Sequence, residues 1–149
     1  MCMVDITSKP GVYREATAKG RIQLKPETVR LMKEGKIEKG DSFNVAKVAG
    51  ILAAKNTSML VPLCHPLPLT KVNIATKIVD KSTVEVEATV KTKAQTGVEM
   101  EALVATSIAL LTIWDMTKQY EKDAKGQYPN TVINNIHVIR KVKEESGRD

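Results

Sequence analysis

The stretch from Thr96 to Tyr120, TGVEMEALVATSIALLTIWDMTKQY, constrains the fold more than any other part of the sequence. Residues 102–114 of this stretch are apolar except for three small hydroxyl residues, which are Thr106, Ser107 and Thr112. A helix on the surface of a globular protein carries a polar face, and this stretch has none. We therefore expect a central helix that is covered on most sides.

Both ends of this stretch have the features of helix termini. Thr96 and Glu99 have the spacing of a capping box, in which two side chains satisfy the free amides at a helix start. Glu99 and Glu101 lie near the N-terminus and Lys118 near the C-terminus, which are the positions that the helix dipole favours. The run is too short and too rich in hydroxyls for a membrane span, which needs about 20 apolar residues.

The charged residues at the two ends are candidates for chemistry. Asp115 and Lys118 are three positions apart and share a face of the helix. Glu101 and Asp115 point to nearly the same side but are separated by about 21 Å along the axis. One compact site on one copy of the helix cannot easily use both. We expect either a long ligand or a site shared with another subunit.

Composition predicts one globular domain over residues 1–149, with a polar arm at 1–14 and a frayed tail at 143–149. Hydrophobic residues make up 42% and charged residues 27% of the chain, which is ordinary for a soluble protein. The first ten residues are polar and do not form a signal peptide. Two cysteines indicate no disulfide framework, which favours the cytoplasm, and their spacing does not predict a zinc site.

The net charge of +6 indicates an anionic partner. Aromatic residues are only 3% of the chain, too few for the stacking platforms of single-strand binders, so a phosphorylated small molecule fits the charge at least as well. No Walker or Rossmann glycine pattern is present. Side chains such as Lys9, Arg14 and His65 would therefore hold any phosphates.

The remaining segments predict an α+β fold. We expect a strand at 17–24, helices at 26–35 and 42–56, strands at 71–80 and 82–92, and a last strand at 131–142. Asp41 or Ser42 would cap the helix at 42–56, whose apolar spacing includes Val45, Val48 and Leu52. A split βαβ, ferredoxin-like sandwich with helices on one face of a mainly antiparallel sheet accounts for this order.

Three prolines between Leu60 and Thr70 exclude a helix there and place His65 on an extended ribbon. His65 is either a structural residue bonded to a backbone carbonyl or a ligand contact. A Cys64–His65 nucleophile pair is disfavoured, because neighbours on an extended chain point to opposite faces.

The lysines and acidic residues also have two interpretations. Lys39 and the Asp115–Lys118 pair are either solvated charges of little energetic worth or groups that exchange protons with a substrate at the edge of a dry core. Glu99 and Glu101 are either partners of the helix dipole or acceptors for a base ring.

Four segments together resemble the MoaC family. They are MVDIT from Met3, KGD from Lys39, LVPLCHPLPLTKV from Leu60, and TGVEMEAL with LTIWDMTK in the long helix, and the similarity covers residues 3–123. The resemblance implies a lyase of molybdenum-cofactor biosynthesis that converts a cyclised dihydro-GTP into cyclic pyranopterin monophosphate and pyrophosphate. It also implies a ferredoxin-like fold, no metal or organic cofactor, and a homohexamer of three dimers with sites between subunits.

Carried over by position, the resemblance assigns the chemistry to named residues. The expected catalytic residues are Asp115, Lys118, Lys39 and His65. The expected substrate-binding residues are Leu63, Cys64, His65, Met100, Glu101, Arg14 and Lys9.

The C-terminus departs from the family, because IRKVKEESGRD stands where many members have a glycine- and lysine-rich tail. Lys141 or Lys143 would replace that tail's contacts. The alternatives from other functional classes are a non-catalytic nucleotide-sensing module and a nucleic-acid-binding module.

Overall fold

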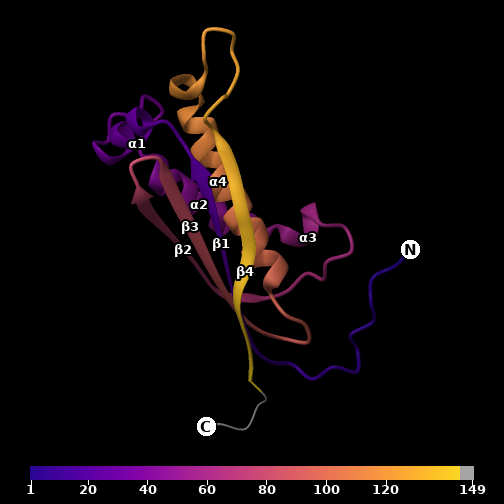
Figure 1. Ribbon diagram of the computed structural model, residues 1–149. Helices are drawn as coiled ribbons and strands as arrows, with labels where there is room; N and C mark the ends of the chain where they lie inside the picture. The colour runs from indigo at the N-terminus through magenta and orange to yellow at the C-terminus, as the bar shows by residue number, and fades with distance from the viewer. Residues whose placement is uncertain (145–149) are drawn as a thin grey trace.

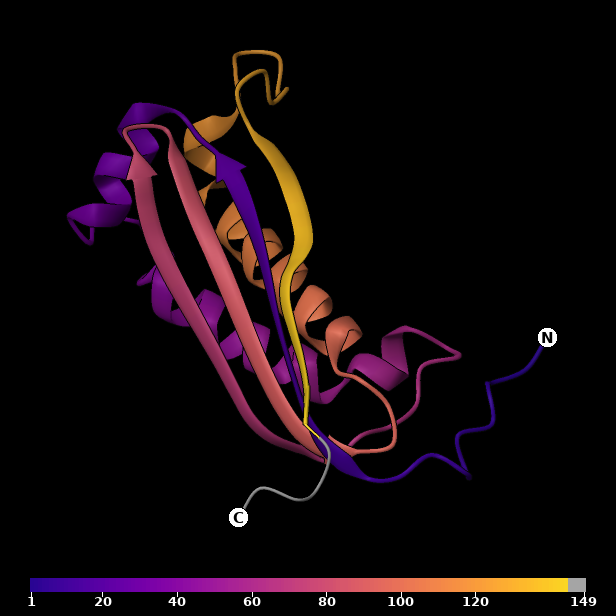
Figure 2. The same cartoon turned by 60° about the horizontal axis from the view of Figure 1, so that its bottom comes forward.

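The computed structural model describes residues 1–144, and the remaining residues of the predicted tail lie outside this range. Its eight elements are β1 (Val12–Gln23), α1 (Pro26–Lys33), α2 (Ser42–Lys55), α3 (Thr57–Leu60), β2 (Leu69–Asp80), β3 (Thr83–Ala94), α4 (Glu99–Glu121) and β4 (Val132–Glu144). The four strands form an antiparallel sheet in the order β2-β3-β1-β4 (Figure 1). Figure 2 looks onto the sheet, with α2 and α4 behind it. The α+β, ferredoxin-like prediction is confirmed.

The core lies between the sheet and the two long helices. Val84, Val86, Ala88 and Val90 of β3 are fully buried, and they pack with α4 in one apolar cluster, as their alternation with polar residues predicts. The opposite face of the sheet carries charged pairs instead. Glu85, for example, bonds to Lys19 and Arg21 of the neighbouring strand. The sheet is therefore dry on the helix side and charged on the other.

Helix α4 runs along the sheet with small residues at its closest contacts. Gly20 of β1 lies under α4, where an added Cβ would come within 2.8 Å of Leu110. Gly50 of α2 lies beside the backbone of α4, where an added Cβ would be 3.2 Å from the carbonyl oxygen of Ala105. These glycines allow the helix to approach its neighbours more closely than larger residues would.

The expectation of a helix covered on most sides is only partly met within one chain. The side of α4 that faces the sheet and α2 is buried, but Leu111 is 53% exposed. In length and hydropathy α4 could cross a membrane, so the sequence argument against a span was too strict. Its buried face against the sheet is the packing of a core helix.

The predicted capping box is wrong. Val98, not Thr96, is the N-cap of α4, and the N-cap residue makes no side-chain capping bond. The Glu99 carboxylate instead forms an ion pair with Lys141 of β4. A charged partner competes successfully with a neutral amide for a carboxylate, which explains the difference.

The exposed side of α2 carries three of the large apolar residues whose spacing predicted the helix. Asp41 caps it as predicted and accepts a hydrogen bond from the Asn44 amide at 3.0 Å. Its buried side consists of small residues such as Ala46 and Gly50, whereas Val48 is 58% exposed. Three large apolar residues on α2 are exposed, and they are Val45, Val48 and Leu52. Close packing against α4 selects the small residues for the inside.

The strand boundaries also shift. β1 begins at Val12 rather than Thr17, so the last part of the expected arm, including Arg14, belongs to the sheet. β4 extends to Glu144, so Lys143 is part of a strand. Pairing with β3 and β4 on either side supplies backbone hydrogen bonds to β1 that no local sequence pattern reveals.

A buried carboxylate fixes the C-terminal end of α4. Glu121 is fully buried, and its two carboxylate oxygens share the single N–H of the Lys25 backbone amide, 3.1 Å from each oxygen, at the start of α1. The hydroxyls of Thr28 and Thr131 also donate to it. With this many donors, the carboxylate is satisfied despite its burial, and it joins α1, α4 and the start of β4.

We expect Gly20→Ala to lower the free energy of unfolding by about 1–3 kcal/mol, because the new methyl group would overlap the side chains of α4. Urea denaturation monitored by circular dichroism measures the change. Gly11→Ala is the matched control, since nothing lies within 4 Å of an added Cβ there. Equal stability of the two variants would contradict the close approach of α4 to β1.

Candidate active site

Two lysines flank one carboxylate at the C-terminal end of α4. Nζ of Lys39 lies 3.0 Å from Oδ2 of Asp115, and Nζ of Lys118 lies 2.9 Å from Oδ1. Lys39 also donates to the backbone carbonyl of Asp115 at 3.0 Å. The structure thus brings together three of the four predicted catalytic residues, which are 76 and 3 positions apart in the chain. We call this group the Lys–Asp–Lys cluster.

The cluster is open to solvent, and its charges stabilise one another. Hydrogen bonds from Lys118 and then Lys39 lower the pKa of the Asp115 carboxyl below its ordinary value. The same contact with Asp115 raises the pKa of the Lys118 ammonium. More than two fifths of each side chain is exposed, so these pairs contribute little to folding stability. Their value lies in holding two ammonium groups at a fixed place.

An aromatic pair borders the cluster. The ring of Trp114 packs on that of Tyr128 with a centroid separation of 5.3 Å. Tyr128 also contributes to the raised pKa of the Lys118 ammonium. No sequence pattern singles out either ring for this site, because Tyr128 follows α4 in a loop whose course depends on tertiary packing.

A cavity of about 470 Å³ lies at the other end of α4. It lies between the N-terminal arm, the proline-rich ribbon and the start of α4. Its lining includes five of the predicted site residues, which are Lys9, Leu63, Cys64, His65 and Met100. We call it the ribbon cavity. Its mixture of apolar walls and a few polar groups suits a flat heterocyclic ring.

His65 makes a hydrogen bond with a backbone carbonyl, as its structural interpretation predicted, and this carbonyl belongs to the N-terminal arm. Its Nε2 lies 2.7 Å from the backbone oxygen of Val4 in the N-terminal arm. The arm crosses from the sheet toward α3, away from the rest of the fold (Figure 1). His65 therefore joins the arm to the ribbon and faces the ribbon cavity at the same time.

Glu101 lies behind the ribbon with one oxygen unpaired. Its side chain is 3% exposed, and Sγ of Cys64 lies 3.8 Å from Oε1. Its Oε2 is buried and has no hydrogen-bond partner among the described residues. Burial raises the pKa of the Glu101 carboxyl, and burial followed by the charge of Glu101 raises that of the Cys64 thiol. A buried carboxylate oxygen without a donor is suited to accept one from a ligand.

Basic residues surround this end of the helix. Arg14 is buried and donates to the backbone oxygen of Gln95 at 3.3 Å, while its Nε has no partner within residues 1–144. Burial disfavours ionisation of Glu99, but the contact with Lys141 outweighs it and lowers the pKa of that carboxyl. Lys141, one of the two lysines expected to replace the contacts of the family's tail, therefore reaches the start of α4.

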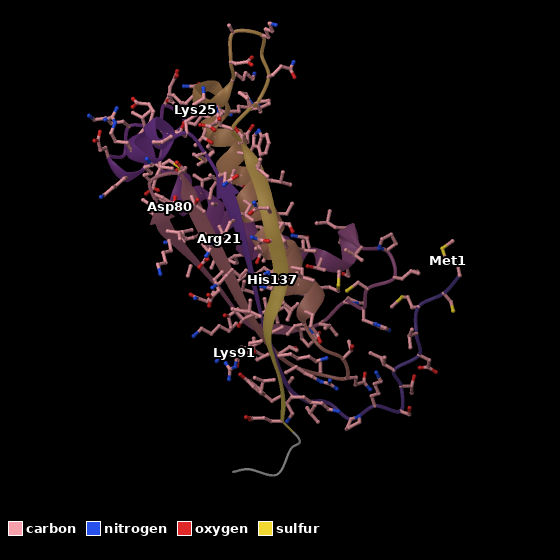
Figure 3. All side chains as sticks on the ribbon, in the orientation of Figure 1. Met1, Arg21, Lys25, Asp80, Lys91 and His137 are labelled. Atoms are coloured by element: carbon pink, nitrogen blue, oxygen red, sulfur yellow. The ribbon has the colours of Figure 1, made fainter. Side chains whose placement is uncertain are left out.

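The predicted residues therefore form two groups at opposite ends of one helix. In Figure 3, the labelled Lys25 lies near the C-terminal end of α4, where it contacts Glu121, and the labelled Met1 lies at the tip of the N-terminal arm. Fourteen residues of α4 separate Glu101 from Asp115, or about 21 Å. His65 does not join Lys39 and Asp115 within this chain. Among residues 1–144, no three His, Cys, Asp or Glu side chains are grouped to hold a metal ion.

Comparison with known proteins agrees with the motifs in both groups. The sequence model of the MoaC family matches residues 3–144. A Pyrococcus horikoshii protein named probable cyclic pyranopterin monophosphate synthase is 56% identical over 146 residues, which are 98% of this chain and 91% of that protein. A Saccharolobus solfataricus protein of the same name is 57% identical over 143 residues, 96% of this chain and 95% of its own. With the whole described fold covered at this identity, the chain belongs to the MoaC family.

Proposed function

We propose that this chain is a cyclic pyranopterin monophosphate synthase of molybdenum-cofactor biosynthesis. It converts a cyclised dihydro-GTP into cyclic pyranopterin monophosphate and releases pyrophosphate. The observation that carries the proposal is the Lys–Asp–Lys cluster, in which Asp115 lies within 3.0 Å of both Lys39 and Lys118. Relatives that share more than half of the sequence carry this name.

The cluster supplies the proton transfers of the reaction. Opening and reclosing the guanine-derived ring needs a group that takes a proton and another that gives one. Asp115 holds both ammonium groups, and the titrations of Asp115 and Lys118 are coupled to each other. A lysine that gives its proton to the substrate when the ring opens takes one back when the ring recloses, so the charge of the cluster is unchanged over the reaction.

The ribbon cavity receives the ring. Leu63 and Met100 supply its apolar walls. Glu101 is not part of the lining but lies behind Cys64, and its buried Oε2 accepts an N–H of the base when the ribbon gives way to the ligand. Cys64 lies against Glu101 and restricts the position of the carboxylate. This arrangement favours a ring with donors on its edge, as a guanine-derived ring has.

The phosphates face the basic residues near the arm. A sugar-derived hydroxyl attacks the α-phosphate, the new P–O bond closes the cyclic phosphate, and the bond to pyrophosphate breaks. His65, Arg14 and Lys9 stabilise the charge that grows on the leaving pyrophosphate. Side chains do this work because the chain lacks a glycine-rich phosphate loop.

The complete site is shared between subunits of a homo-oligomer, a hexamer built as a trimer of dimers. Two observations support this. The two groups of site residues lie at opposite ends of α4, too far apart for one compact site. Large apolar side chains of α2 and α4 are also exposed, as an interface with a second copy would require, and they are Val45, Val48, Leu52 and Leu111. The chain acts as one cytoplasmic domain on a small-molecule substrate, without membrane or nucleic acid.

The direct test is incubation of the purified protein with the cyclised dihydro-GTP. We expect pyrophosphate and a pterin product in equal amounts. Binding of GTP without any turnover would instead indicate a nucleotide-sensing module. Binding of nucleic acid that weakens steeply with salt, again without turnover, would indicate a nucleic-acid-binding module.

We expect Lys118→Ala to lower the rate of product formation by about 10²–10⁴-fold, because it removes one of the two proton-transfer groups. The fold should be unchanged, since the lost ion pair is exposed. Lys122→Ala, one turn farther along the chain, is the matched control. A Lys118→Ala protein with normal turnover would remove this lysine from the mechanism.

Mixing two inactive variants tests whether the site is shared. If each site takes Asp115 from one chain and Glu101 from another, then equal amounts of Glu101→Ala and Asp115→Asn chains regain about a quarter of wild-type activity after subunit exchange. That fraction is the chance that a site receives the intact half from each parent. No recovery after proven exchange would mean that each chain builds its own site.

The raised pKa of Glu101 predicts a pH-dependent stability. The folded protein holds the Glu101 proton more tightly than the unfolded chain, whose carboxyl titrates near 4.5, so ionisation costs folding free energy as pH rises above that value. Glu101→Gln should therefore match wild type in acid and become the more stable protein toward neutral pH. Urea denaturation across this range measures both curves. Parallel curves would contradict the raised pKa.

A further inference from the structure

The loop that carries Lys39 is attached to α4 by contacts that do not involve the Lys39 side chain. The backbone N–H of Glu38 donates to the hydroxyl of Tyr120 at 2.8 Å. The side-chain amide of Gln119 donates to Oε2 of Glu38 at 2.9 Å. Both contacts are made by the residue directly before Lys39, and both partners lie in the last two turns of α4.

The same short segment is anchored on its other side by the core. Ile37 is buried in the apolar cluster, and its carbonyl accepts a hydrogen bond from the Gly40 amide at 3.0 Å. Gly40 has a φ of +110°, which lets the chain turn sharply into the Asp41 cap of α2. Tyr120 itself packs partly buried against the core. The Tyr120 hydroxyl is therefore held between its own ring, which packs against the core, and the turn that follows Ile37.

These contacts matter because Lys39 has to change partners during the reaction. At rest its Nζ is bound to Oδ2 and the backbone oxygen of Asp115. When Lys39 exchanges a proton with the substrate, it gives up part of its contact with Asp115. Its long side chain then regains rotational freedom. The backbone must remain in place if the ammonium group is to return to the same position.

We propose that Tyr120 is a positioning residue for Lys39. Its hydroxyl holds the Glu38 amide, and the Gln119–Glu38 hydrogen bond supports the same loop. The inference rests on the proposed function, in which Lys39 transfers protons. Small displacements of a reacting group are costly in enzymes, so a contact of ordinary strength in a loop has a measurable effect on turnover.

The first test is Tyr120→Phe, which removes one oxygen atom and keeps the ring in the core. We expect kcat to fall by about 10-fold with KM within about 2-fold of wild type, because binding groups at the ribbon cavity are untouched. A looser Lys39 stabilises ionised Asp115 less, which raises the pKa of that carboxyl and moves the acid limb of the rate profile to higher pH.

The matched control is Tyr13→Phe. Its hydroxyl also makes one side-chain hydrogen bond, to Glu15 at 2.6 Å on β1. We expect this variant to keep wild-type kcat and pH profile, and both variants to unfold within a few degrees of each other. A Tyr120→Phe protein with the kcat and pH profile of wild type would overturn the inference. So would equal losses in the two variants.

Exchanging the amide and the carboxylate of the Gln119–Glu38 hydrogen bond gives an independent test. Gln119→Glu places a carboxylate against Glu38, and we expect repulsion to lower kcat by about 3-fold. Glu38→Gln combined with Gln119→Glu restores an amide–carboxylate pair in the reverse sense and should recover most of the loss. A double variant no better than Gln119→Glu would contradict the role of this contact.

The two proposals fail differently in these experiments. Wild-type protein that forms no pyrophosphate from the cyclised dihydro-GTP would overturn the proposed function, and the positioning role with it. Active wild-type protein together with an unimpaired Tyr120→Phe would overturn the positioning role alone.

Discussion

The close packing of α4 on the sheet is the constraint on which the rest of the structure depends. Gly20 and Gly50 remove the side chains that would otherwise hold α4 away from β1 and α2. The helix is then fixed at its C-terminal end by the buried carboxylate of Glu121, which takes donors from α1 and from the residue before β4. Because α4 cannot shift, both of its ends present side chains at defined places.

The C-terminal end of α4 carries a group of exposed charged side chains. Asp115 accepts from two lysines that approach from different parts of the chain, one from the loop after α1 and one from α4 itself. Exposed pairs of this kind contribute little to folding. In the proposed function, this geometry preorganises the site for proton transfer, because the charged groups are already in place before substrate binds.

The N-terminal end of α4 borders a cavity. The proline-rich ribbon is stiff and cannot form a helix, so Leu63 and His65 line a cavity instead of continuing the core. Glu101 behind them is buried, and its Oε2 has no hydrogen-bond partner among residues 1–144. A buried oxygen without a donor costs folding free energy. In the proposed function, a ligand supplies the missing donor, one end of the helix serves the ring and the other the proton chemistry, and a second subunit brings the two ends together.

Much of this could be predicted from the sequence because the signals are local. The alternation of valines in β3, the Asp41 cap and the run of apolar residues in α4 each report on neighbours within a few positions, so the elements and the ferredoxin-like order followed. The motifs around Lys39, His65 and Asp115 also identified the family. These patterns determined which segments fold and which residues are candidates for chemistry.

Only the tertiary structure decided which groups meet. The contact of Lys39 with Asp115, the attachment of its loop to Tyr120 and the pairing of Glu99 with Lys141 all join residues that are distant in the chain. No periodicity encodes such contacts, because they depend on how helices and strands pack in three dimensions. The helical spacing of apolar residues in α2 likewise did not decide which of them are buried: Val45, Val48 and Leu52 are exposed, while Ala46 and Gly50 are buried.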